Sequence, residues 1–141
     1  MPLSTDQMDL IRDSFEQLRS DLQPKSIAFY QSLFELAPHL KPMFRDDDLA
    51  GQGMRFMSTL GAIVDNLHTP EAMEQRFRYL GAGHRAMGVT VQDFAPMGVA
   101  LIETLANTLG NEFTDETREA WTQAYADFSR EIIKRGKIPE A

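Results

Sequence analysis

One histidine lies where its imidazole could serve as a metal ligand. His84 follows Phe77 and Leu80 at helical spacing, so the three side chains share one face of a helix that Gly88 is expected to end. Near a helix end, one ring nitrogen can bond to the helix backbone while the other points into a neighbouring pocket. On spacing alone, a histidine on an apolar helix face more often has a structural role, so the pattern leaves both interpretations open.

Tyr30 and Gln52 could supply polar contacts to a small molecule in such a pocket. A tyrosine hydroxyl can donate a hydrogen bond, and a glutamine amide can donate while its carbonyl accepts. Arg55, three residues after Gln52, adds a guanidinium that could pair with an anionic group. The ordinary alternatives are a core tyrosine bonded to a carbonyl and two side chains that face the solvent.

The composition is that of one globular domain, which we expect to span residues 1–141. Hydrophobic residues make up 43% of the chain, enough to form a core, and 21 acidic against 14 basic residues give a net charge of −7. An acidic chain without a Lys/Arg-rich run argues against nucleic acid or an anionic membrane as a partner. The absence of cysteine excludes disulfides, thiolate metal sites and a cysteine nucleophile.

The sequence also carries no sign of a targeting or membrane segment. Its N-terminus lacks the basic start and apolar run of a signal peptide. No apolar run approaches the roughly 18 residues that a membrane span requires. We therefore expect a cytoplasmic protein.

Apolar residues recur at spacings of three and four throughout, and no segment alternates as a strand would, so the sequence predicts an all-α fold. Glycine, proline and capping residues separate the expected helices at residues 4–21, 24–37, 50–66, 70–88, 94–110 and 114–136, with a short helical piece over 38–44 and a charged loop over 45–48. Ser4 with Gln7 is typical of a capping box. We expect Thr69 to cap a helix that starts at Pro70, and Gly136 to end the last helix as its C-cap.

Several motifs, taken in order along the chain, resemble the globin family from about residue 4 to residue 135. Residues 29–34 with 38–44 look like the second and third globin helices, and Phe44 falls where globins place a phenylalanine that stacks on the haem. Gln52 and Phe56 look like the two distal positions that face the ligand. His84 lies 32 residues after Gln52, which is the distal-to-proximal separation of globins with this pattern. Residues 109–114 and 120–125 resemble the last two helices of single-domain bacterial haemoglobins and neuroglobins.

The resemblance implies a globin fold, a three-over-three helical sandwich, that encloses a b-type haem (iron protoporphyrin IX). His84 would be the iron ligand. Tyr30 and Gln52 would donate hydrogen bonds to the bound gas, whose partial negative charge attracts such donors. The side chains expected to contact the haem are Phe44, Arg55, Phe56, Leu80, His84, Val89, Phe94 and Met97.

The same resemblance suggests a function. Tyr30 and Gln52 are similar to the distal pair of flavohaemoglobins and their single-domain relatives, in which the pair accompanies tight oxygen binding and conversion of nitric oxide to nitrate. We expect reversible binding of dioxygen, nitric oxide and carbon monoxide, with nitric oxide dioxygenase activity if an external reductase supplies electrons. We expect no reductase within these 141 residues, which contain no Gly-rich dinucleotide fingerprint and are too few to include a flavin domain.

The pattern departs from flavohaemoglobins behind the proximal histidine. Those proteins usually set a Tyr and a Glu there, whereas Phe94 and Gly136 occupy the corresponding places here and cannot hydrogen-bond through a side chain. We therefore expect peroxidase-like activity to be low. The alternative function is a gas-sensing or protein-interaction globin module without catalysis. If that module binds no haem, bulky side chains such as Phe56 and Met54 would fill the pocket.

Other polar residues are assigned no ligand role. His39 and His68 lie next to a proline break and a turn, so both are expected to be exposed. The acidic run Asp46 to Asp48 is expected to be a solvated loop rather than a metal site.

Overall fold

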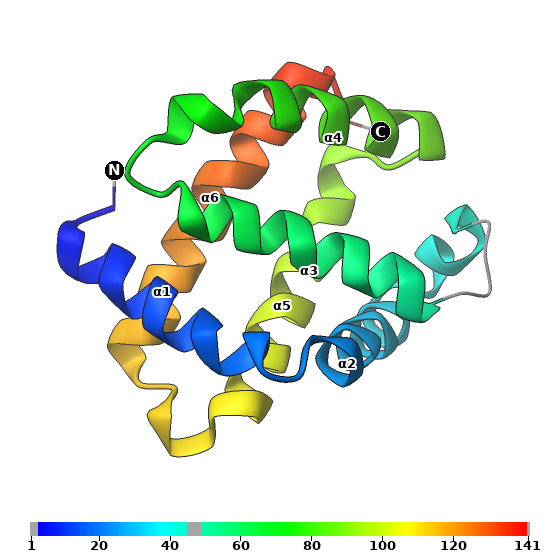
Figure 1. Cartoon of the computed structure of the whole chain (residues 1–141). Coiled ribbons are helices and arrows are strands. Elements are labelled where there is room, and N and C mark those ends of the chain that lie inside the picture. Colours follow the sequence, from blue (N-terminus) through cyan, green and yellow to red (C-terminus); the bar gives the residue numbers. More distant parts are fainter. Residues whose placement is uncertain (1–2, 45–48, 141) are drawn as a thin grey trace.

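The computed structural model describes residues 3–44 and 49–140, and these residues form helices and connecting turns without a strand (Figure 1). The all-α prediction is therefore confirmed. The elements are α1 (Thr5–Arg19), α2 (Leu22–Leu36), η1 (Pro38–Met43), α3 (Leu49–Asp65), η2 (Pro70–Met73), α4 (Glu74–Met87), η3 (Val91–Asp93), α5 (Phe94–Leu109), η4 (Gly110–Glu112) and α6 (Asp115–Gly136), where η marks a 3₁₀ turn. The run 45–48, expected as a charged loop, lies outside the described residues.

The helices form two crossed layers of three. The first layer contains α1, α3 and α4, and the second contains α2, α5 and α6. The most extensive contacts join the layers, between α4 and α6, α2 and α3, and α1 and α6, while α2 also packs along α5. In Figure 1, α3 and α4 run across the front with α5 and α6 crossing behind them. This is the three-over-three sandwich of the globin fold.

The helix ends follow the capping signals in part. Ser4 and Gln7 form the expected capping box at the start of α1, and Thr114 accepts from the Thr117 N–H at the start of α6. Thr69 makes no side-chain cap bond, and Pro70 opens the 3₁₀ turn η2, so the α-helix itself begins one turn later than expected. Gly88 ends α4 with a positive φ of 95°, as predicted.

The prediction for Gly136 was wrong. Lys137 is the left-handed C-cap residue of α6, with φ of 54°, while Gly136 is the last helical residue and is buried. Its role is close packing, because a Cβ added to Gly136 would lie 2.3 Å from the Cα of Gly81 on α4. Gly53 on α3 allows a similar approach, since a Cβ there would lie 2.3 Å from the Ser26 Oγ on α2. Glycine thus brings both helix pairs close together.

The core between the layers is mainly apolar, and Trp121 on α6 lies within it. Trp121 is buried, tilts against the Phe15 ring and donates from its indole nitrogen to the Ser14 Oγ at 2.8 Å. This bond ties α1 to α6. Within residues 3–44 and 49–140, none of the helices has the length and apolar character needed to cross a membrane.

Candidate functional site

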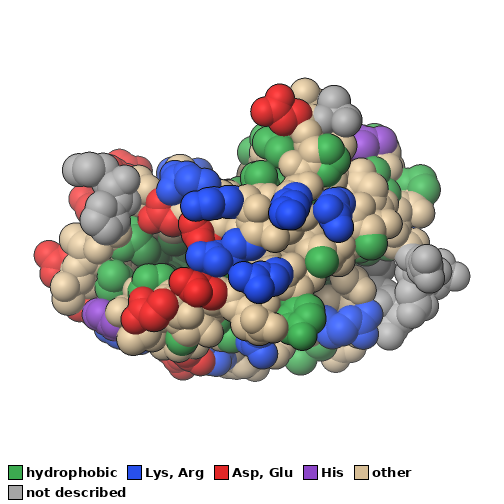
Figure 2. All heavy atoms as spheres, turned by 90° about the horizontal axis from the view of Figure 1, so that it is seen from above, with side chains coloured by type: hydrophobic (Ala, Val, Ile, Leu, Met, Phe, Trp, Pro, Cys, Tyr) green, Lys and Arg blue, Asp and Glu red, His purple; other side chains and the backbone are tan. Residues whose placement is uncertain are grey.

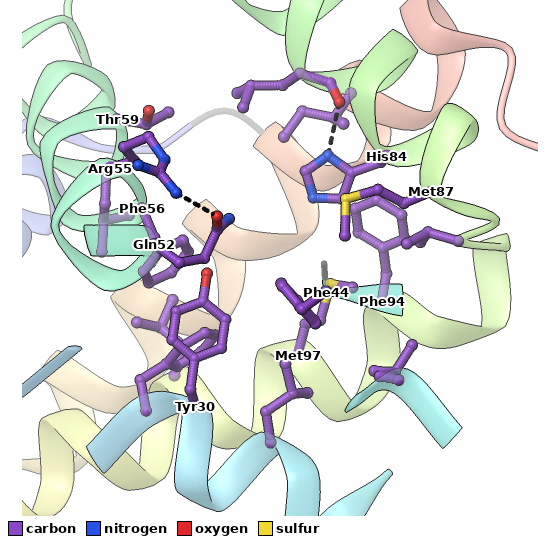
Figure 3. Close-up of a pocket in the computed structure, with 18 of the residues that line it drawn as sticks. Tyr30, Phe44, Gln52, Arg55, Phe56, Thr59, His84, Met87, Phe94 and Met97 are labelled. Carbon is purple, nitrogen blue, oxygen red and sulfur yellow. Dashed lines mark hydrogen bonds between the residues drawn. The ribbon is translucent and has the colours of Figure 1, made fainter. Parts of the chain in front are cut away.

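A cavity of about 370 Å³ lies between the helices, with α3 on one side and α4 on the other. Its size is in the range of small-molecule and cofactor sites, and its wall is mostly apolar. All ten side chains singled out from the sequence line this one cavity: Tyr30, Phe44, Gln52, Arg55, Phe56, Leu80, His84, Val89, Phe94 and Met97. Figure 3 shows how those that it labels converge from α2, α3, α4 and α5.

The His84 imidazole is held by the backbone of its own helix. Its Nδ1 lies 2.6 Å from the Leu80 carbonyl oxygen, one turn earlier in α4. Because a carbonyl can only accept, Nδ1 carries the proton and Nε2 keeps a free lone pair. The ring points into the cavity (Figure 3) and lies beside the Phe94 ring, with a centroid separation of 5.8 Å. The arrangement suits coordination of a metal through Nε2.

Tyr30 lies on the other side of the cavity, on α2, and is only 4% exposed. Burial raises the pKa of its hydroxyl to about 12, although a hydrogen bond from the Gln52 side chain and the charge of Arg55 work in the opposite direction. At neutral pH the residue is therefore a phenol, which can donate a hydrogen bond.

Gln52 and Arg55, for which the sequence offered separate polar roles, bond to each other. The Gln52 Oε1 accepts from the Arg55 Nη2 at 2.8 Å, so this carbonyl binds the guanidinium rather than the tyrosine hydroxyl. The amide nitrogen remains for the Tyr30 side, which agrees with the lowering effect of Gln52 on the Tyr30 pKa. Arg55 is exposed at the cavity edge. A positive charge there can pair with an anionic group of a bound molecule.

Aromatic rings form the wall around Tyr30. The Phe44 ring meets the Tyr30 ring edge-on at 5.4 Å, and the Phe56 ring stacks on Phe29 at 4.4 Å with an interplanar angle of 10°. Met54 is 40% exposed and does not line the cavity. The expectation that Phe56 and Met54 could fill the pocket is thus not met, because Phe56 is fixed to the wall and Met54 faces away.

Among the described residues that line the cavity, none on the proximal wall is acidic. Leu80, Val89, Phe94 and Met97 contribute apolar surface. Tyr125, which the sequence analysis did not assign, also lines the cavity, and its hydroxyl donates to the Phe94 backbone carbonyl at 2.6 Å. The hydroxyl is therefore engaged away from the imidazole. Burial raises the pKa of Tyr125 well above its ordinary value.

A second feature that the sequence analysis missed lies between η1 and η3. His39 is exposed, as expected, but its Nε2 lies 2.7 Å from the Oδ1 of the buried Asp93. Burial raises the pKa of Asp93, yet hydrogen bonds from the Thr90 N–H and from His39 outweigh that effect, so the pKa of Asp93 lies below its ordinary value. The pair joins the two turns that precede Phe44 and Phe94. His68 is also exposed, as predicted.

The two-layer helical sandwich encloses an apolar pocket that contains a histidine, which is the architecture of the globin fold. The comparison with known sequences agrees. The globin family model matches residues 27–132. The chain therefore belongs to the globin family.

Its relatives include several neuroglobins. The chain is 31% identical over 137 residues to the neuroglobin of Dissostichus mawsoni and to that of Danio rerio, covering 88% of this chain and 86% of each relative. It is 32% identical over 155 residues to neuroglobin-1 of Oncorhynchus mykiss, covering 96% of both. As a globin, the protein binds haem and a diatomic gas such as dioxygen.

The residues present fit a haem. The imidazole presents a lone pair to an apolar cavity, which is how globins hold the iron from one side. The Arg55 guanidinium at the cavity edge suits the carboxylates of a porphyrin. The phenol and amide on the opposite wall suit a polar gas ligand.

Proposed function

We propose that this globin holds haem b through His84 and binds dioxygen, nitric oxide and carbon monoxide beside Tyr30 and Gln52. We further propose that it converts nitric oxide to nitrate with electrons from a separate reductase. The net reaction joins one nitric oxide, one dioxygen and one electron to give one nitrate ion. When bound, the haem supplies the iron that coordinates the gas and changes between the ferrous and ferric states.

The chain supplies orientation and polarity. The Leu80 carbonyl keeps the His84 Nδ1 protonated, so that Nε2 is the ligand atom. The Tyr30 phenol donates to the negatively polarised gas, and the Gln52 amide supports it from α3 while Arg55 holds the Gln52 carbonyl. The aromatic wall keeps water away from these donors and so strengthens their bonds.

The observation that supports the proposal most is the meeting of two separate features in one cavity. A histidine with one nitrogen fixed lies on α4, and a protonated phenol paired with an amide lies opposite, on α2 and α3. Neither feature alone indicates gas binding. Together they match a site that holds a metal on one side and polarises a small ligand on the other.

The haem assignment is tested by replacing His84 with glycine and measuring the Soret band after reconstitution. We expect the His84→Gly variant to lose the wild-type spectrum and to regain it with added imidazole, which can occupy the vacated space. His68→Gly, at an exposed histidine, serves as the control and should retain the spectrum. An unchanged spectrum in His84→Gly would refute the ligand assignment.

The nitric oxide chemistry is tested separately in a single turnover. The oxygenated protein mixed with one equivalent of nitric oxide should give nitrate and ferric protein within the mixing time. If nitrite or unreacted nitric oxide accumulates, the protein binds gas without this reaction. Haem binding and dioxygenation can therefore succeed or fail independently.

A further inference from the structure

Lys and Arg side chains gather on one face of the protein in spite of its negative net charge. That face is formed by α4 and the C-terminal end of α6. Figure 2 looks onto it and shows Lys and Arg spheres across its middle, with Asp and Glu mainly toward one end. The chain as a whole has 21 acidic and 14 basic residues, so a cluster of Lys and Arg on one face is not explained by the overall composition.

Four exposed cations make up what we call the proximal basic patch: Arg78 and Arg85 on α4, and Lys134 and Lys137 at the end of α6. Their elements touch where a Cβ added to Gly81 would lie 2.4 Å from the Gly136 Cα. Each of the four lies within four residues of this contact along its own helix or at its cap, so the charges belong to one surface.

The charges of the patch are not balanced locally. In the part of the chain that the structure describes, none of the four cations forms an ion pair, whereas Arg135 between them is paired with Glu74 and Glu131. The sequence from Gln75 to Gln92 contains no acidic residue, nor do residues 132–139. The surface therefore presents net positive charge that a partner can use.

The patch lies directly outside the proximal side of the cavity. Arg85 follows His84 in the chain, and Gly81 follows Leu80, whose carbonyl holds the imidazole. A groove between α3 and α4, bordered by the 69% exposed Tyr79, reaches the same imidazole wall. The patch and the cavity wall thus share helices α4 and α6.

We propose that the proximal basic patch is the docking surface for an acidic electron-donor protein. This inference rests on the proposed function, in which the protein needs electrons from outside. One electron would pass from the reduced donor to the ferric centre, so the donor is oxidised and the iron reduced, with no bond or proton exchanged. Weak, charge-steered contacts of small area are typical of such encounters. An exposed aromatic beside the charges adds the kind of contact that interfaces favour.

The test measures reduction of the ferric protein by an acidic flavodoxin in its hydroquinone form, followed at the Soret band. The Arg78→Glu/Lys134→Glu double variant should react at least about tenfold more slowly than the wild type at low ionic strength. The wild-type rate should fall as salt is added, and the two rates should converge because salt screens the attraction. The matched control, Lys25→Glu/Arg118→Glu, makes the same charge change on other faces and should alter the rate by less than about twofold.

Equal slowing of both double variants would overturn the proposal, because it would show an effect of net charge alone.

Docking is also measured without haem, by carbodiimide cross-linking of the apoprotein to flavodoxin. Lys134 or Lys137 should be the cross-linked residues, and cross-links elsewhere would contradict the patch assignment. If the wild-type protein showed no haem spectrum after reconstitution, the proposed function would be refuted. The cross-linking measurement would still test the docking surface, because it uses the apoprotein. If the patch variant loses binding to phosphatidylserine vesicles but is reduced at the normal rate, the surface is a membrane site and the proposal is wrong.

Discussion

The imidazole of His84 is oriented by a neutral partner. Its Nδ1–H donates to the Leu80 carbonyl oxygen, and the Phe94 ring flanks the imidazole. A carbonyl adds less electron density to the ring than a carboxylate would, and a neutral proximal imidazole favours reversible gas binding over cleavage of an oxygen–oxygen bond. At the level of single residues, the pocket is therefore suited to holding a gas, and in the function we propose its polar specificity depends on Tyr30 and Gln52.

Tyr30→Phe should speed the dissociation of dioxygen by about 10- to 100-fold, because a hydrogen bond to a polarised ligand contributes about 1.5 to 3 kcal/mol. The ring packing on Phe29 and Phe44 is retained. Tyr125→Phe is the matched control, since its hydroxyl lines the same cavity but donates to a backbone carbonyl. Stopped-flow displacement by carbon monoxide measures both rates. Equal rates in the wild type and Tyr30→Phe would mean that the phenol does not contact the gas.

Two pairs of elements are held together by contacts of one or two residues, so a small substitution at either contact is expected to move them apart. α4 and α6 approach through the backbones of Gly81 and Gly136, and the turns η1 and η3 are joined by His39 and Asp93. The first contact positions the helix that carries His84. The second positions the turns beside Phe44 and Phe94. Both lie outside the cavity, yet each fixes one of its walls.

Gly136→Ala should destabilise the protein by about 1 to 3 kcal/mol, because the added methyl group meets the Gly81 backbone, which cannot yield without moving α4. Gly83→Ala is the control on α4, since a Cβ there meets nothing within 4 Å. It should stabilise the protein by about 0.5 to 1 kcal/mol through the helical preference for alanine. Urea unfolding of the two variants measures the difference, and similar stabilities would contradict the packing role.

Asp93→Asn should cost about 1 kcal/mol at pH 7, because a charge-assisted bond from the Thr90 N–H becomes a neutral one. The folded-state pKa of Asp93 is depressed, so its contribution is complete above the unfolded value and is lost as pH falls through the folded value. The cost should therefore shrink below about pH 4. Chemical denaturation in a His39→Gln background isolates the carboxyl from the imidazole. A cost that stays constant with pH would refute this account.

The whole molecule is joined across its layers by interactions that connect distant parts of the chain. The Trp121 indole on α6 donates to Ser14 on α1, although 107 residues separate them. The N-terminal helix is thereby fixed to the last helix, on the side of the core away from the cavity. We expect this buried bond between distant parts of the chain to couple the unfolding of α1 to that of α6.

Ser14→Ala should lower the free energy of unfolding by about 1 to 3 kcal/mol, because the buried indole N–H loses its acceptor. The double variant with Trp121→Phe should cost less than the two single variants added together, since no donor is left unpaired. Thermal unfolding of the four proteins in this cycle provides the measurement. Strict additivity would show that the bond contributes nothing.

Sequence reasoning was most successful where a pattern acts locally. Helical spacing, the Ser4 capping box and the glycine stop at Gly88 depend on neighbouring residues, so they could be read directly. The cavity residues were found through the family resemblance, which carries information about distant contacts. The role of Gly136 was missed because a glycine near a helix end usually caps it, and no local signal shows a partner helix at its surface. The pairing of His39 with Asp93 was missed for the same reason, since it spans 54 residues.

The buried Trp121 is the sole indole in the sequence, so the ultraviolet emission of this protein comes mainly from one site of known surroundings. An indole enclosed by apolar side chains emits at shorter wavelength than one in water, and a porphyrin in the neighbouring cavity would quench it by energy transfer. The Trp121 emission should therefore fall when the porphyrin binds, rise when it is lost, and shift to longer wavelength when the first helix detaches. No attached label is needed.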